Sequence, residues 1–172
     1  MSSLSASKEE ISIRLKVPAE WEGIEPVREA VGKVLHVVFL DRDIEDAVSM
    51  VCAELLDNAL RYGVPDQSGI SFSLQILEGQ LVVSVSHAVA FGSPDVPRLL
   101  DRLAWVGRQA DPAQAFVDAL AQVGARMIDA PGDGGAGVGL ARVAYMGGCR
   151  LAADTSSSER VTVIATRALV QE

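Results

Sequence analysis

The sequence has few cysteines, no long apolar run and no excess of basic residues. Only two of its 172 residues are cysteine, Cys52 and Cys149. Both lie in apolar surroundings, and neither has a neighbouring Cys or His at metal-ligand spacing. This pattern is typical of buried free thiols in a reducing compartment, so it argues against a disulfide-rich secreted fold.

Membrane and export signals are also missing. The longest apolar run, Val34 to Leu40, is interrupted by His36, whereas a spanning helix needs about 20 apolar residues. The first five residues contain neither the basic nor the apolar region of a secretory signal. We therefore expect a cytoplasmic protein without a membrane span, and a polar, disordered tail over residues 1–10.

Basic residues are outnumbered, with 15 Lys and Arg against 23 Asp and Glu and a net charge of −8. A phosphate-backbone partner needs a concentrated basic patch, so nucleic-acid binding is not expected. Hydrophobic residues make up 49% of the chain, which is typical of a globular protein. The length fits a single domain, which we place at residues 11–172.

A helix ending near Tyr62 carries the first candidate site. Glu54 and Asn58 are four residues apart, so they share one helical face, with Asp57 and Arg61 beside them. Asn is a poor residue for a helix interior, so its presence calls for a reason. The alternative is an ordinary solvated face in which an acidic residue pairs with the arginine.

The second candidate is the glycine-rich turn 134–140, which leads into an apolar helical run over 138–146. Such a turn lets backbone N–H groups approach a phosphate at a helix start. Glycines also form turns that bind nothing, and the turn alone does not exclude that alternative.

Together the two segments resemble the ATP-binding domain shared by histidine kinases, gyrase, Hsp90, MutL and the anti-sigma-factor serine/threonine kinases. The first motif of that superfamily is Glu-x-x-x-Asn-Ala followed by His/Tyr-Gly, here Glu54 to Ala59 and then Tyr62-Gly63. The second is similar to Gly-x-Gly-Leu-Gly-Leu, here residues 135–140. The resemblance covers about residues 11–169 and is nearest to the small anti-sigma-factor kinases.

The resemblance implies that ATP and Mg²⁺ bind, with Asn58 as the magnesium ligand and Glu54 as the general base. It implies phosphate contacts from the glycine-rich turn, at Gly135, Gly137, Gly139 and Leu140. Asp57 or Arg61 could touch the nucleotide, or could pair with each other on the helix surface.

One motif of the superfamily is missing. Asp-x-Gly-x-Gly normally follows the second hairpin strand, and its Asp binds the adenine amino group. Here Ser86 or His87 occupies that place, and no paired glycine follows. A serine hydroxyl can accept one hydrogen bond from an amine, with less strength than a carboxylate.

Hydrophobic periodicity predicts the element order β-α-α-β-β-α-α-α-β-β. The predicted strands are 11–17, 69–77, 81–87, 150–154 and 161–167. The helices are predicted to begin at Pro26, at Asp41 or Asp43, at Pro94, at Pro112 and at Val138. Residues 130–137 are expected to form a flexible hinge, the interval in which the superfamily carries a lid. Paired hairpins and grouped helices favour an α+β fold, a two-layer α/β sandwich in which a mixed sheet has helices on one face.

Three functions remain open from the sequence. The first is an ATP- and Mg²⁺-dependent serine/threonine protein kinase or anti-sigma-factor-like regulator with a regulatory protein partner. The second is a non-catalytic member of the same fold that sequesters a partner, with homodimerisation through the first strand and helix as one route. The third is a receptor for another small ligand in the same cleft.

Overall fold

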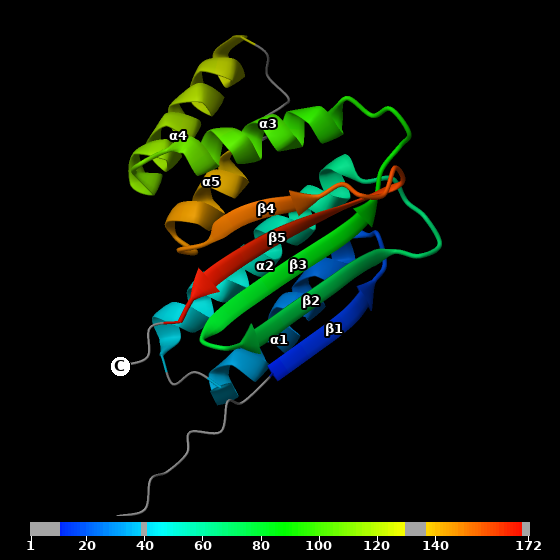
Figure 1. Cartoon of the computed structure of the whole chain (residues 1–172), viewed down its shortest axis with the longest axis vertical. Helices are drawn as coiled ribbons and strands as arrows, with labels where there is room; N and C mark the ends of the chain where they lie inside the picture. The colour runs from blue at the N-terminus through cyan, green and yellow to red at the C-terminus, as the bar shows by residue number, and fades with distance from the viewer. Residues whose placement is uncertain (1–10, 39–40, 130–136, 170–172) are drawn as a thin grey trace, which may run out of the picture.

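The computed structural model describes residues 11–38, 41–129 and 137–169. The chain alternates between strands and groups of helices in the predicted order (Figure 1). The strands are β1 (Ile11–Val17), β2 (Ile70–Leu77), β3 (Gln80–Ala88), β4 (Arg150–Asp154) and β5 (Arg160–Ala168). The helices are α1 (Ile24–Val38), α2 (Arg42–Tyr62), α3 (Asp95–Arg108), α4 (Pro112–Asp129) and α5 (Val138–Tyr145), and a 3-10 turn, Trp21–Gly23, precedes α1.

The five strands form one sheet in the order β1-β2-β3-β5-β4. Every strand pair in the described part of the chain is antiparallel, so the expectation of a mixed sheet was wrong. The reason lies in the β4–β5 hairpin. Its second strand, β5, lies beside β3 and runs antiparallel to it. The strand that runs parallel to β3 is β4, which lies at the edge of the sheet and pairs with β5.

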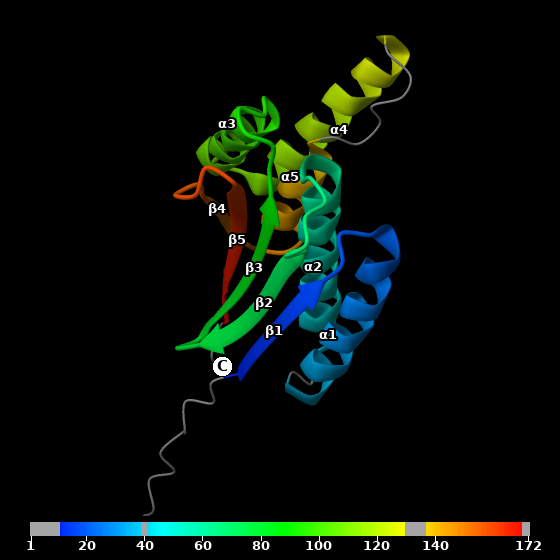
Figure 2. The ribbon, with the colours of Figure 1, turned by 90° about the vertical axis from the view of Figure 1, so that its right-hand side faces the viewer.

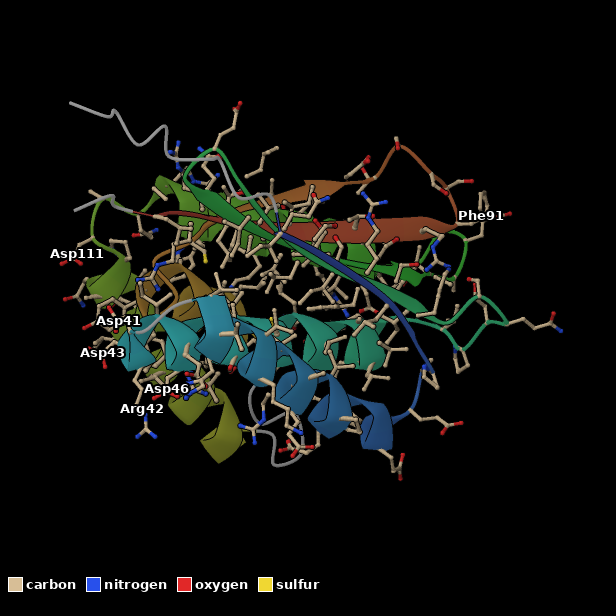
Figure 3. The ribbon with its side chains drawn as sticks, turned by 90° about the horizontal axis from the view of Figure 1, so that it is seen from below. Asp41, Arg42, Asp43, Asp46, Phe91 and Asp111 are labelled. Carbon is tan, nitrogen blue, oxygen red and sulfur yellow. The ribbon has the colours of Figure 1, made fainter. Side chains whose placement is uncertain are left out.

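The fold is a two-layer α/β sandwich, as predicted. Helices α1 and α2 lie against one face of the sheet with α5 beside them, and α3 and α4 lie beyond the β4 edge (Figures 1 and 2). Figure 3 shows the sheet above the α1–α2 layer. Alternate strand residues face the helices and are buried, among them Phe72, Leu74, Leu81, Val83, Val85 and Val163.

Helix α2 is the long central element, and both of its ends have identifiable causes. Asp41 is the N-cap, because its side chain accepts a hydrogen bond from the Asp43 backbone N–H at 2.9 Å. At the other end, the Gly63 N–H donates to the Ala59 carbonyl. The first turn carries the acidic residues Asp43 and Glu45, whose charges interact favourably with the positive end of the helix dipole. Figure 3 shows Asp41, Asp43 and Asp46 together at this end of α2.

Both cysteines are buried, as predicted. Burial raises the pKa of the Cys52 thiol well above its usual range and that of Cys149 to about 11. Thiols that stay protonated are poor nucleophiles, so neither cysteine carries the chemistry of the site. Within the described ranges, none of the helices combines the length and apolar character that crossing a bilayer requires.

Candidate functional site

The side chains of Glu54 and Asn58 meet the beginning of α5. A β-carbon placed on Gly139 would lie 2.5 Å from Glu54 Oε2 and 3.9 Å from Asn58 Nδ2. A side chain at position 139 would therefore displace the Glu54 carboxylate from this place. Two segments more than 80 residues apart in sequence thus form one site, at the junction of α2 with α5.

Arg142, one turn further along α5, holds the Glu54 carboxylate. Its Nη1 donates to Glu54 Oε1 at 3.1 Å. The side chains are 43% and 21% exposed, and a solvent-accessible pair of this kind contributes little net stability. Arg142 therefore orients the carboxylate without locking it.

Asn58 presents an unusual amide. Its Nδ2 is buried and has no hydrogen-bond partner among the residues that the structure describes. An unpaired buried donor costs roughly 1–3 kcal/mol, and such groups concentrate where a ligand completes the hydrogen bonding. Asn58 is therefore the strongest single indication of a binding site at this junction.

The start of α5 is tied to α3 through Arg102. Gly137 is the N-cap of α5 and has a φ of 105°, a left-handed conformation that favours glycine. Arg102 donates from both Nε and Nη2 to the Gly137 carbonyl, at 2.8 Å and 2.5 Å. Its guanidinium also lies 4.2 Å from the centroid of the Trp105 ring, a cation–π contact.

A cleft of about 740 Å³ opens between these helices. Its volume lies within the range of roughly 300–1,000 Å³ typical of small-molecule sites. Its walls come from the end of α2, the length of α3, the middle of α4 and the start of α5. The lining side chains include Asn58, Arg61, Tyr62, Arg98, Arg102 and Trp105. The lining also includes two acidic side chains, Asp95 and Asp101. Three arginines against two aspartates, with two aromatic rings, leave a small excess of positive charge that suits an anionic ligand with a ring system.

Asp57 and Arg61 form an ion pair on α2, with Arg61 Nε 3.1 Å from Asp57 Oδ2. The Arg61 guanidinium also lies 6.0 Å from the Trp21 ring centroid. Arg61 lines the cleft, whereas Asp57 faces its arginine. Asp57 and Arg61 thus pair on the helix surface, one of the two alternatives left open by the sequence. Arg61 also reaches the cleft, as the other alternative required.

Ser86 lies on the opposite side of the sheet from this site. Its hydroxyl accepts a hydrogen bond from Arg160 Nε at 3.4 Å, and its carbonyl accepts one from Arg160 Nη2 at 3.0 Å. Arg160 also binds Asp66, and so fastens the loop before β2 to the open face of the sheet. The structure therefore does not bring Ser86 together with Asn58.

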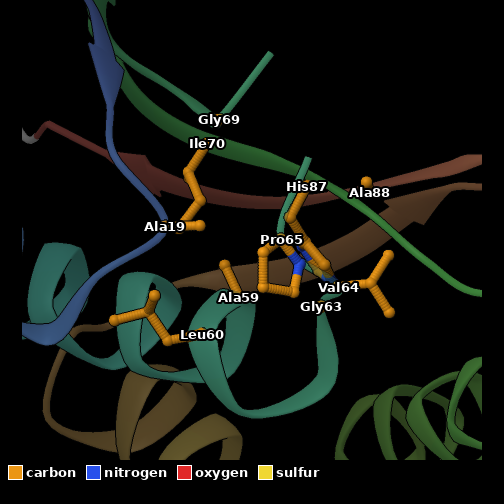
Figure 4. Close-up of a pocket in the computed structure, with 10 residues that line it drawn as sticks. All are labelled: Ala19, Ala59, Leu60, Gly63, Val64, Pro65, Gly69, Ile70, His87 and Ala88. Carbon is orange, nitrogen blue, oxygen red and sulfur yellow. The ribbon is translucent and has the colours of Figure 1, made fainter. Parts of the chain in front are cut away.

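His87, the next residue, points into the helix layer (Figure 4). Its ring lines a cavity of only about 20 Å³, together with Ala59, Gly63 and Pro65. His87 is 4% exposed, and its Nδ1 has no partner among the described residues. Burial, with a smaller contribution from the positive charge of Arg160, lowers the pKa of His87 to about 4. The uncharged His87 imidazole therefore occupies most of the space between the end of β3 and the end of α2.

Gly63 makes room for this ring. A β-carbon there would overlap the Ala59 carbonyl oxygen and would lie 2.9 Å from His87 Cδ2. The backbone at Gly63 is extended, with a φ of −81°, so the glycine is required by space and not by its dihedral angles.

We expect Gly63→Ala to lower the free energy of unfolding by about 2 kcal/mol, the cost of overpacking a filled site. Gly107→Ala and Gly124→Ala are matched controls in helices α3 and α4, because a β-carbon at either position meets open space. Both should be neutral or stabilising by up to about 1 kcal/mol. Urea unfolding measures all three, and equal stability of Gly63→Ala and the controls would contradict the packing of His87 against Gly63.

The structure brings most of the predicted residues to one place. Asn58, Arg61, Gly137 and Leu140 line the cleft, and Glu54 adjoins it through Gly139. Gly135 and the predicted hinge lie outside the described residues, apart from Gly137.

Two arginines of the site were missed from the sequence. Arg142 stands three residues after Gly139, so a cation following the glycine motif on the apolar helix was a usable signal. No sequence signal pointed to Arg102, because its partner Gly137 lies 35 residues away.

The residues present fit a magnesium–nucleotide complex in part. Mg²⁺ usually takes one or two protein oxygens and completes its octahedron with phosphates and water. Asn58 can supply one such oxygen. The described residues contain no group of three or more His, Cys, Asp or Glu side chains that could hold a metal ion by themselves. Any Mg²⁺ here would depend on the phosphates of its ligand.

Comparison with known proteins shows the fold. No protein-family model matches the chain, and no curated protein matches it in sequence. The chain is similar to a chain in the crystal structure of the SiaB–SiaC complex from Pseudomonas aeruginosa, with a TM-score of 0.69 and 20% sequence identity. The match covers 90% of this chain and 88% of that chain. At this identity the likeness establishes a shared architecture.

Proposed function

We propose that this protein is a regulator that binds Mg²⁺–ATP in the 740 Å³ cleft and phosphorylates a serine or threonine of a protein partner. The resemblance to the anti-sigma-factor kinases motivates the activity. The fold shared with a chain of a two-protein complex supports a role exercised through a protein partner.

The observation that carries this proposal is the convergence of Glu54 and Asn58 on Gly139. An acid and an amide reach the first turn of a helix beside a cleft that contains Arg61, Arg98 and Arg102. The helix start and the guanidinium groups favour anions. A triphosphate needs this combination, because its charge must be compensated on several sides.

The chemistry assigned to the site is transfer of the γ-phosphoryl group to a hydroxyl. The bond from the hydroxyl oxygen to the γ-phosphorus forms, the bond to the β-phosphate oxygen breaks, and the hydroxyl proton moves to Glu54. Mg²⁺, held by Asn58, would neutralise the phosphate charge. Arg142 keeps the Glu54 carboxylate at the first turn of α5, where it can receive the proton.

A second function has a specific observation in its favour. The place where the superfamily binds adenine is filled by His87, and Ser86 faces the other side of the sheet. A chain that had lost nucleotide binding would keep the fold and bind its partner without catalysis. The two functions differ in one simple measurement, the response of stability to Mg²⁺–ATP.

We expect Mg²⁺–ATP to raise the melting temperature of the protein. A ligand at 100 times its dissociation constant adds about 2.7 kcal/mol to the free energy of unfolding. Asn58→Ala should abolish most of this shift, because it removes the proposed magnesium ligand. Differential scanning fluorimetry at several millimolar Mg²⁺–ATP provides the readout.

Gln75→Ala is the matched control, since it removes an amide from β2, where the neighbouring residues Leu74 and Ile76 point inward. It should retain the full shift. A wild-type protein whose melting temperature does not respond to millimolar Mg²⁺–ATP would favour the non-catalytic function.

A further inference from the structure

We propose that the cleft holds the nucleotide's base by stacking alone, without reading its edge, so that purine and pyrimidine nucleoside triphosphates bind with similar affinity. This inference rests on the proposed nucleotide binding and adds its ligand class. It assigns the base to the α2–α3 wall of the cleft, against Tyr62, Leu99 and Trp105.

The end of β3 has no room for a base. The cavity there has a volume of about 20 Å³, the scale of one water molecule. The His87 ring closes it from the sheet and the α2 backbone at Gly63 closes it from the other side (Figure 4). A base could enter only if the ring and the end of α2 both moved.

The larger cleft has both the room and the surfaces. The Arg102 guanidinium lies over the Trp105 ring, 4.2 Å from its centroid, and both side chains line the cleft. Tyr62 and Leu99 extend this wall. Aromatic rings and guanidinium planes accept any base, because every base presents a π face.

Strong selection between bases would need a buried polar group on the wall that holds the base, against Tyr62, Leu99 and Trp105. A site rejects the wrong ligand most strongly when its own buried polar groups are left unpaired. Among the residues that the structure describes, the buried side-chain nitrogens without a partner are Asn58 Nδ2 and His87 Nδ1. Asn58 lies beside Gly139, at the end of the cleft assigned to the phosphates, and His87 lies outside the cleft.

Apart from Asn58, the polar side chains considered at this cleft are solvent-accessible or engaged with neighbours. Asp95 accepts a hydrogen bond from Arg98 at 3.3 Å, and Gln122 accepts one from Arg102 at 3.3 Å. Water can replace a lost contact to an accessible group, so a mismatch there has little effect. We therefore expect small affinity differences between bases.

The experiment is isothermal titration calorimetry of the full chain with Mg²⁺ complexes of ATP, GTP and CTP, and with magnesium tripolyphosphate. We expect dissociation constants for the three nucleotides within about fivefold of one another, and weaker binding of tripolyphosphate, which has no base. Trp105→Leu should weaken all three nucleotides by a similar factor, and by more than it weakens tripolyphosphate.

Ser86→Ala is the control for base reading at β3, and it should change none of the affinities. A preference for ATP of 30-fold or more over GTP and CTP would overturn the inference while leaving nucleotide binding intact. A Ser86→Ala variant that alters the ATP-to-GTP ratio would do the same. Absence of binding by all four ligands would instead overturn the proposed function, and the inference with it.

Discussion

Glu54→Gln is expected to slow phosphoryl transfer to the partner protein by about 10²–10⁴-fold, the usual contribution of a positioned general base. Glutamine has nearly the same shape as glutamate, so the packing against Gly139 is retained. It cannot accept the hydroxyl proton, because its amide is not basic. Nucleotide affinity should change by only a few-fold, since the phosphate contacts are assigned to other residues.

The measurement is transfer of labelled phosphate from ATP to candidate partner proteins in single-turnover conditions. Glu45→Gln is the matched control, because it neutralises an acid on the same helix that pairs with His36 instead. Transfer by Glu54→Gln at the wild-type rate would remove Glu54 from the chemistry. Arg142→Met separates orientation from proton acceptance, because it frees the carboxylate and leaves its charge in place.

The second large effect is a loss of protein stability at acidic pH. Protein stability is expected to fall by about 3 kcal/mol between pH 7.5 and pH 4 through His87 alone. The pKa of His87 is lowered to about 4 in the folded chain, whereas an unfolded histidine titrates near 6.5. Between these values the unfolded state binds the proton and the folded state does not, so stability is lost as the pH falls through this window.

The groups around His87 support this direction. The buried ring faces Gly63 and Ala59 of α2, and the nearby charge is the Arg160 guanidinium, which opposes protonation. The pKa of Asp66 lies below its usual range because its carboxylate accepts a hydrogen bond from Ser68, with Arg160 contributing. Its stabilising effect is therefore lost only at a more acidic pH than that of His87.

Urea unfolding at intervals from pH 7.5 to pH 4 tests the prediction. His87→Gln should flatten the curve relative to wild type, whatever its absolute stability, because it removes the titrating group. His36→Gln removes the other histidine, which is exposed on α1, and serves as the matched control. Parallel curves for wild type and His87→Gln would show that His87 is not buried as a neutral ring.

Much of the fold could be read from local patterns. The alternation of Ile11, Ile13, Leu15 and Val17 predicted β1 to the residue, and the bounds predicted for β4, residues 150–154, are also those observed. An aspartate marked the start of α2, and its cap at Asp41 is present. Proline at 112 marked the start of α4, where the Asp111 side chain accepts a hydrogen bond from the Ala113 N–H. Boundaries failed where two signals competed. Pro26 was expected at the first position of α1, but the helix begins at Ile24 after a 3-10 turn.

The candidate site could be predicted in part for a similar reason. Glu54 and Asn58 share a helical face because their spacing matches the helical period. The glycines near 137 marked a turn because glycine tolerates conformations that other residues avoid. That these segments meet at Gly139 was an expectation from resemblance, since 80 residues separate them and no local rule relates them.

The sequence by itself determined the elements, their order, their buried faces and the chemical types of the candidate residues, because all of these depend on neighbours within a few positions. Only the tertiary structure decided that β5 lies beside β3 and that Arg102 and Arg142 join the site. It also decided that Ser86 and His87 face opposite sides of the sheet, with His87 beside a cavity of only about 20 Å³. These features depend on contacts between distant segments, and their geometry arises when the core packs as a whole.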